Sequence, residues 1–308
     1  MIVSQRPPFT SLITILLAVV VVGWLFVGQT IGIVVGSFIY DGDFLAAMTD
    51  PENHPEIKHA LLFSQGIGSA IGLIFVPYLY LKTFERQDFS NFFKTERQLP
   101  MVMVIIFIII ISLSLAISPI MEWNSNIEFP EWMSGFGNWA KHTEDLAAEL
   151  IKTITSNLTI ADLILTFIVV AVIPALGEEI VFRGMIQTEM TRVVKNPHVG
   201  IWLSAILFSA IHLQFMGFVP RVLLGALFGY LYYWSGNLWI PILAHFFNNG
   251  FQVIALYLFQ KGIITINLES AESAPLPMVA IALILTFAIL YYLRNYFKSR
   301  STASSDSF

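Results

Sequence analysis

The feature that most constrains this chain is a series of apolar segments, each about 20 residues long, which is the length of helix that crosses a bilayer. The chain is 56% hydrophobic and only 12% charged. An average soluble domain has roughly 25% charged residues. Too few charged side chains are present to cover a water-exposed surface. The sequence therefore predicts an all-α integral membrane protein.

The apolar segments predict about eight transmembrane helices. They lie near residues 11–38, 59–82, 100–121, 160–186, 199–213, 218–233, 238–260 and 276–294. No internal repeat divides them, so we expect residues 1–298 to form a single polytopic membrane domain. The small polar residues 299–308 are expected to form a disordered C-terminal tail.

The charged loops alternate in sign, which predicts how the helices cross the membrane. Acidic residues gather in loops 41–56, 122–131 and 269–272. Basic residues lie in the other loops and near the ends: Arg6, Lys82, Arg86, Lys94, Arg97, Arg192, Lys195, Arg294, Lys298 and Arg300. Short cytoplasmic loops retain Lys and Arg, so both termini are predicted to be cytoplasmic. We expect a bacterial inner-membrane protein whose active site faces the cytoplasmic side.

Residues 122–158 form the longest segment outside the predicted spans. Three Trp residues precede an acidic stretch in which Leu150 and Ile154 follow helical spacing. This pattern is typical of an amphipathic helix at the membrane interface, with Trp rings at headgroup level. A packed loop without membrane contact is the alternative.

Several functional classes are excluded by composition. The chain has no cysteine, so a disulfide, a thiolate zinc site and a cysteine nucleophile are ruled out. Its formal net charge is -5, and no basic cluster is present that could bind phosphates, which argues against nucleic acid as a partner.

Polar residues within the predicted spans are concentrated in the second half of the chain. An ionisable residue inside a span costs roughly 2.5–3.5 kcal/mol on insertion scales and usually has a function. The helix near 160–186 carries Glu178, Glu179 and Arg183, the next ends at His212, and the helix near 238–260 carries His245, Asn248 and Asn249. By contrast, Arg221 lies near the end of its span, where we expect it to reach the outer interface.

Helical spacing pairs these polar residues. Residues four apart share a helical face, so Glu179 and Arg183 are predicted to form an ion pair that leaves Glu178 facing elsewhere. His245 and Asn249 have the same spacing and share a face.

Together these groups have the parts needed to hydrolyse an amide. Glu178, helped by His212, can act as a general base that takes a proton from water. His245 and Asn249 can donate hydrogen bonds to the developing oxyanion. The sequence therefore predicts a peptidase site inside the membrane.

Three motifs resemble those of a known family. Residues 178–183 read EEIVFR and resemble an EExxxR motif, residues 208–212 an FxxxH motif and residues 245–249 an HxxxN motif, with a typical lead-in at 236–241. In this order and spacing, over roughly residues 160–255, they resemble the CPBP family of intramembrane endopeptidases. That family comprises CAAX protease, bacteriocin-processing, Abi and Rce1-like proteins.

The resemblance implies a glutamate-dependent endopeptidase of eight helices, with a cavity open to the cytoplasm and to lipid. It implies that Glu178 activates water with His212 as its partner, and that His245 and Asn249 stabilise the oxyanion. Glu179 and Arg183 would contact these residues and hold them in position without taking part in the reaction.

Metal dependence is open at this point. The family is commonly labelled metalloprotease, and Glu178, His212 and His245 could supply the three protein ligands of a catalytic zinc. The HExxH helix of many zinc proteases is absent. A zinc site and a metal-free site are both compatible with these residues.

The predicted substrate is a hydrophobic or lipidated peptide that enters from the bilayer, and membrane lipids are the surrounding partner. Two other functions are alternatives to the predicted peptidase. A small-solute transporter could use helix breaks such as Pro174 and Pro241, although matching broken helices in two halves are absent. A non-catalytic immunity or scaffold protein could keep the same fold and bind peptide without cutting it.

Overall fold

The computed structural model describes residues 7–94, 96, 99–156, 158–265 and 272–305, and these residues form helices and connecting turns with no strand among them. The α-helices are α1 (Pro8–Thr14), α2 (Gln29–Ile39), α3 (Phe44–Thr49), α4 (Lys58–Ala70), α5 (Val76–Tyr80), α6 (Leu99–Ala116), α7 (Ser118–Ser125), α8 (Ser134–Thr155), α9 (Ile160–Phe167), α10 (Ile173–Glu179), α11 (Thr188–Val194), α12 (Pro197–Ala210), α13 (Phe218–Ser235), α14 (Trp239–Gln260) and α15 (Leu276–Ser305). Wider π-helical turns join α1 to α2, α4 to α5, and α9 through α10 to α11, so each group is one continuous helix.

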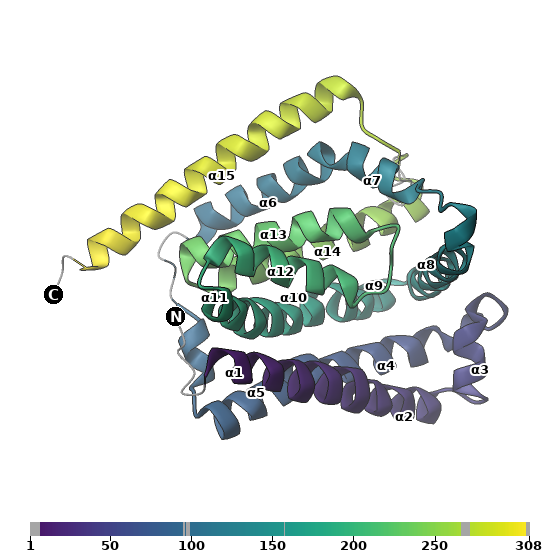
Figure 1. Ribbon diagram of the computed structural model, residues 1–308. Helices are drawn as coiled ribbons and strands as arrows, with labels where there is room; N and C mark the ends of the chain where they lie inside the picture. Colours follow the sequence, from purple (N-terminus) through teal and green to yellow (C-terminus); the bar gives the residue numbers. More distant parts are fainter. Residues whose placement is uncertain (1–6, 95, 97–98, 157, 266–271, 306–308) are drawn as a thin grey trace.

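The helices pack in three layers (Figure 1). A hairpin of α1–α2 against α4–α5 forms one outer layer, and α6 with α15 forms the other. The central layer contains α9 to α14. In the second outer layer, the Ser112 hydroxyl of α6 donates to the Ala282 carbonyl of α15 at 2.8 Å. The three predicted motifs all lie in the central layer.

Six helices are long and apolar enough to cross a membrane among the residues described: Pro8–Ile39, Pro55–Glu85, Leu99–Ala116, Ile160–Val194, Trp239–Gln260 and Leu276–Ser299. The chain is therefore a multi-pass membrane protein. The other two predicted spans correspond to α12, a shorter apolar helix of 14 residues, and to α13. Both pack within the central layer, where neighbouring protein rather than lipid covers much of their surface, so a weaker apolar signal suffices.

The loops separate into two ends of the bundle, as their charges predict. At the basic end, the amide of Asn237 donates to the Lys94 carbonyl, and the Tyr296 hydroxyl donates to Glu96. At the acidic end, Lys58 donates to the Ser156 carbonyl. The start of α1 and the C-terminal part of α15 lie at the same end of the bundle (Figure 1), in agreement with an even number of crossings. Arg6, Arg97 and Glu269 lie outside the described residues.

The segment 122–158 contains a helix, α8, at the acidic end. Its Leu150 and Ile154 pack against a buried cluster that includes Phe44 and Ile57. Trp132, which precedes α8, is 83% exposed. The helical half of the prediction is confirmed, and contact between the Trp rings and lipid stays a prediction.

The C-terminal tail differs from the prediction. Helix α15 continues to Ser305, so residues 299–305 are helical where the polar composition predicted disorder. A helix already formed by the apolar residues extends one residue at a time at little cost. Residues 306–308 lie outside the described part of the chain.

Candidate active site

Three elements of the central layer carry the site. Glu178 and Glu179 end α10, which is followed by a π-helical stretch, Ile180–Gln187, that contains Arg183. π-Helical turns are often found at functional sites. His212 follows α12, and His245 lies on α14. The fold brings the EExxxR and HxxxN motifs into direct contact, with the FxxxH motif packed against both.

Glu179, Arg183 and His245 form a fully buried network, in which each is at most 4% exposed. Arg183 Nη1 donates to Glu179 Oε1 at 2.7 Å, which confirms the predicted ion pair. His245 Nδ1 lies 2.8 Å from the same oxygen. Arg183 Nη2 donates to the Gly225 carbonyl at 3.0 Å. Additional hydrogen bonds of this kind help a buried charge pair to be tolerated, although Glu179 Oε2 is buried with no hydrogen-bond partner among the described residues. The contact with Glu179 Oε1 holds His245 in one orientation.

Aromatic rings enclose the network on both sides. The Arg183 guanidinium lies 4.6 Å from the Phe208 ring centroid and 5.3 Å from that of Phe228. The Phe228 ring stacks on the His245 imidazole at 5.1 Å. Cation–π contacts of this kind stabilise a desolvated cation. The contact of Phe228 with the site was not predicted from the sequence, because Phe228 lies in an apolar helix where a Phe usually serves only for packing.

Glu178 faces a different direction from Glu179 and is 8% exposed. Its Oε2 lies 3.8 Å from His245 Nε2, which is too long for a hydrogen bond but close enough for strong electrostatic interaction in a buried site. The two ring nitrogens of His245 therefore face two carboxylates, with Nδ1 bonded to Glu179 and Nε2 turned toward Glu178.

His212 occupies the other side of the Phe208 ring. Its Nδ1 hydrogen-bonds to the Phe208 carbonyl at 2.7 Å, and among the described residues it makes no hydrogen bond or ion pair with Glu178. The next residue, Leu213, has a φ of 56°, a strained left-handed conformation for a bulky residue. The predicted partnership between His212 and Glu178 stays a prediction, because His245 is the imidazole that lies next to the carboxylate.

The Asn249 side chain is engaged with the neighbouring helix. Its Nδ2 donates to the Val170 carbonyl at 3.0 Å, and its Oδ1 accepts from Asn248 at 3.0 Å. A primary amide has two N–H donors, so one donor of Asn249 remains for an oxyanion. Its predicted catalytic role stays a prediction.

Arg221 lies in the first turn of α13 and bonds to the loop that joins α12 to α13, and its predicted reach to the outer interface stays a prediction. Its Nη2 donates to Gln214 Oε1 at 2.8 Å, and the side chain is half-buried. Within the described residues no carboxylate oxygen lies within 4.0 Å of its guanidinium. Arg221 thus adds positive charge to the same level of the bundle as His212.

The loop that joins α12 to α13 and carries His212 is held from the acidic end. Asn124 of α7 donates to the Phe215 carbonyl at 3.0 Å and accepts from the Val219 amide at 2.8 Å. Glu144 of α8 accepts from the Met216 amide at 3.3 Å. Partial burial raises the pKa of the Glu144 carboxyl, while this amide and the Arg221 charge act in the opposite direction.

The donor set does not fit a bound metal. Among the described residues, no three His, Asp or Glu side chains are grouped closely enough to hold a metal ion. Glu178, His212 and His245 are not grouped in this way, and the Phe208 ring contacts both histidines, with centroids at 5.1 and 6.1 Å. We therefore derive no step of the reaction through zinc.

Comparison with known proteins gives a family match that covers the site and two partial matches to curated proteins. Residues 160–251 match the family profile described as "Type II CAAX prenyl endopeptidase Rce1-like". The uncharacterized protein YpbD of Bacillus subtilis (strain 168) is 34% identical over 76 residues, which cover 23% of this chain and 35% of that protein. The membrane-embedded CAAX protease MroQ of Staphylococcus aureus (strain USA300) is 34% identical over 91 residues, covering 28% of this chain and 36% of MroQ.

The matched segments span about a third of the length of these curated relatives. No solved structure matches the chain. The matched region 160–251 contains all three motifs that meet in the central layer. Over this matched region and its motifs, the chain is similar to the CPBP family of CAAX-protease-like membrane proteins.

Proposed function

We propose that this protein is an intramembrane endopeptidase that hydrolyses a peptide bond in a membrane-associated or lipidated peptide. The observation that carries the proposal is the position of His245, whose ring lies between Glu178 and Glu179 in a buried site. Glu179 orients the His245 imidazole, and Glu178 lies beside that imidazole. This arrangement is suited to acid–base chemistry.

In the proposed reaction, Glu178 takes a proton from a water molecule, and the resulting hydroxide attacks the peptide carbonyl. When both its ring nitrogens are protonated, His245 donates through Nδ1 to Glu179 and through Nε2 to the oxyanion. The second N–H of Asn249 is the other proposed donor. Glu178 then returns the proton to the leaving amine. Arg183 and His245 both contact Glu179 Oε1, so that the orientation of His245 is fixed before substrate binds.

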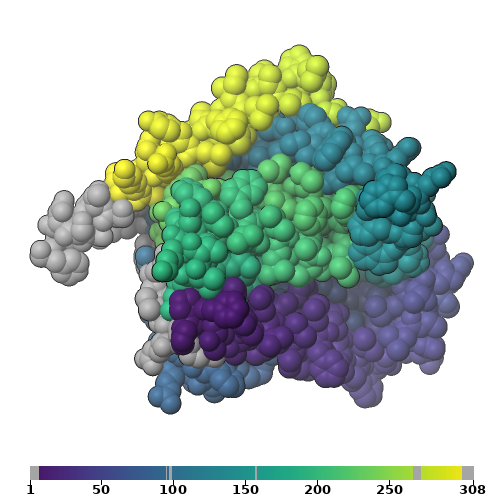
Figure 2. Space-filling view, viewed as in Figure 1, coloured from purple at the N-terminus to yellow at the C-terminus, as the bar shows by residue number. Residues whose placement is uncertain are grey.

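The surface of the central layer supports entry of a hydrophobic substrate from the bilayer. On one face, the central helices reach the surface between the α1–α5 hairpin and the α6–α15 layer (Figure 2). There α12 exposes apolar side chains that are 40–44% accessible: Val199, Trp202, Leu203 and Ile206. A membrane protein presents such residues to lipid tails, through which an apolar or lipidated segment can approach. We place the basic end of the bundle on the cytoplasmic side of a bacterial inner membrane.

The proposal is tested by cleavage of a quenched fluorescent peptide library that includes lipidated members, with the purified protein in lipid nanodiscs. We expect wild type to cleave a subset of hydrophobic or lipidated peptides, and Glu178→Ala to cleave none of them. A zinc chelator is expected to leave the rate unchanged, because the donor set does not form a metal site.

Three results would contradict parts of this proposal. Loss of cleavage in chelator that added zinc restores would show that a metal takes part. Absence of cleavage by folded wild type across peptides that bind to it would favour a non-catalytic immunity or scaffold function. Saturable transport of a small solute by vesicles containing the protein would favour a transporter.

A further inference from the structure

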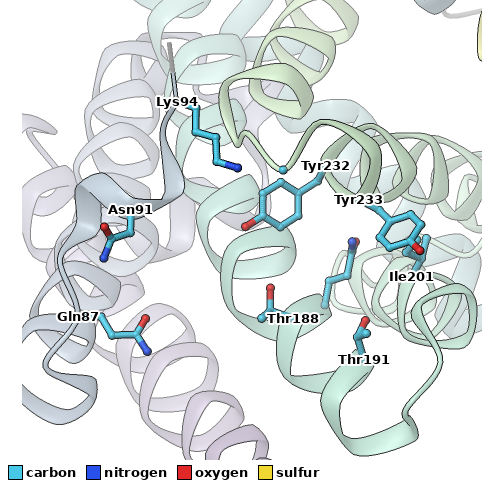
Figure 3. Close-up of a pocket in the computed structure, with 10 residues that line it drawn as sticks. Gln87, Asn91, Lys94, Thr188, Thr191, Ile201, Tyr232 and Tyr233 are labelled. Atoms are coloured by element: carbon cyan, nitrogen blue, oxygen red, sulfur yellow. The ribbon is translucent and has the colours of Figure 1, made fainter. Parts of the chain in front are cut away.

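A cavity of about 620 Å³ lies at the basic end of the bundle, away from the catalytic residues. It lies between the loop after α5 and the ends of α11 and α13 (Figure 3). Polar residues form most of its wall: Gln87, Asn91, Lys94, Gln187, Thr188, Thr191, Tyr232 and Tyr233. We call it the loop cavity. Gln187 separates it from the active site, because Gln187 follows Arg183 by one turn and donates to the Gly229 carbonyl.

Two amide oxygens in the wall of the loop cavity have no hydrogen-bond partner among the described residues. They are Gln87 Oε1 and Gln187 Oε1, and both atoms are buried. The Gln187 side chain is only 5% exposed. An unsatisfied buried polar atom costs about 1–3 kcal/mol. Both oxygens are acceptors, and a rotation of the two amide side chains into the cavity would let a ligand that carries hydrogen-bond donors satisfy them.

The charge of the wall is positive. Lys94 is its one charged residue, and no carboxylate lines the cavity. The Lys94 side chain extends toward Tyr232, with Thr188 on the facing helix (Figure 3). The Thr188 hydroxyl already donates to the Arg183 carbonyl, so the available donors are the Lys94 ammonium and hydroxyls such as those of Thr191 and Tyr233. These donors around one space favour an anion. The wall therefore selects a ligand with both an anionic group and its own donors.

The backbone of Lys94 is held in place by hydrogen bonds, which supports a binding role for its side chain. Its backbone N–H donates to Asn237 Oδ1 at 3.1 Å, and its carbonyl accepts from Asn237 Nδ2 at 3.0 Å. Asn237 follows Gly236, whose φ of 58° ends α13 in a conformation that favours glycine. The loop backbone is thus tied to the central layer, and the Lys94 side chain is left available to a ligand.

We propose that the loop cavity binds the phosphate-bearing headgroup of a membrane lipid whose headgroup also carries hydroxyl donors, such as phosphatidylglycerol. The phosphate would accept from Lys94 and the hydroxyls, and the headgroup hydroxyls would donate to Gln87 and Gln187. The volume lies within the range of about 300–1,000 Å³ found for small-molecule sites. Tyr233 and Trp239, both more than 40% exposed, mark this end as the headgroup level.

Native mass spectrometry of the purified full-length protein tests the proposal. Phosphatidylglycerol is compared with phosphatidylcholine, which has the same phosphate but a headgroup without N–H or O–H donors. We expect preferential binding of phosphatidylglycerol and about a fivefold weaker affinity in Lys94→Ala, as one Lys near anionic lipid contributes roughly 1 kcal/mol. The matched control is Lys82→Ala, an exposed lysine at the same end that does not line the cavity.

Equal binding of the two lipids, or equal loss of affinity in the Lys94 and Lys82 variants, would overturn the proposal. A second experiment uses glycerol 3-phosphate, which also carries a phosphate and hydroxyl donors but has no acyl chains. If this ester bound with Lys94 dependence and phosphatidylglycerol did not displace it, the ligand would be a soluble phosphate ester. Glu178→Gln should bind phosphatidylglycerol as wild type does, so that loss of catalysis and loss of this site are separate results.

Discussion

The two histidines of the site are held in very different ways. His245 lies within a helix, 4% exposed, and its Nδ1 is bonded to a carboxylate that Arg183 also contacts. His212 lies just beyond the end of α12, half-buried, and bonds to the carbonyl of its own helix. The contrast indicates that the His245 side is fixed by the folded core, whereas the position of His212 depends on a loop.

The loop on the His212 side is supported by elements outside the central layer. Asn124 and Glu144 reach it from α7 and α8, and Leu213 is strained within it. Substitutions on the His245 side should therefore reduce stability and activity together. Substitutions on the His212 side should separate the two.

Arg183→Ala is expected to have the largest effect. Removal of the guanidinium leaves Glu179 as a buried carboxylate with only His245 as a partner, which destabilises a protein by about 3–5 kcal/mol. Thermal unfolding of the purified protein should show a large fall in Tm. The double variant Arg183→Met with Glu179→Gln removes both charges and should recover much of that loss. A single variant as stable as wild type would contradict the account of a buried, paired network.

His212→Ala should affect activity far more than stability. We expect a fall in the cleavage rate of about 100-fold, because we propose in addition that His212 assists Glu178 in taking the proton from water, with a loss of stability of about 1 kcal/mol from one hydrogen bond. The matched comparison is His245→Ala, which should lower both the rate and Tm. Equal loss of Tm in the two variants would show that the two sides are equally part of the core.

Glu144→Gln should produce the smallest effect, and one that depends on pH. Burial raises the pKa of Glu144 above its value in the unfolded chain. A carboxyl with a raised pKa favours the folded state at low pH, and this contribution is lost as the pH rises through the folded-state pKa. Wild type should therefore lose stability relative to Glu144→Gln between about pH 4 and 6, by less than about 1 kcal/mol because solvent screens this half-exposed group. A difference in Tm that is constant across this range would contradict the assignment.

Much of the helical architecture could be predicted from the sequence, because apolar length and charge alternation are local signals. The i,i+4 pair of Glu179 and Arg183 was predictable for the same reason, since both residues lie on one helix. The two shorter central helices α12 and α13 were predicted in place, although only six helices of the described chain are long and apolar enough to span a membrane alone.

The contacts between helices could not be predicted. Helical spacing fixes which residues share a face, but the rotation of one helix against another depends on packing. That rotation places His245 rather than His212 beside Glu178, and it turns Asn249 toward the Val170 carbonyl. The bond between Arg221 and Gln214 could not be predicted for a related reason, because Gln214 lies in a loop whose path has no periodic signal.

The most direct test of the central claim is the cleavage rate of Glu178→Gln on a peptide that wild type cleaves. The amide keeps the size of the carboxylate but cannot take a proton from water. We expect a fall of at least about 100-fold, the range for loss of a general base, with Tm close to that of wild type. A rate within twofold of wild type would show that Glu178 is not the base.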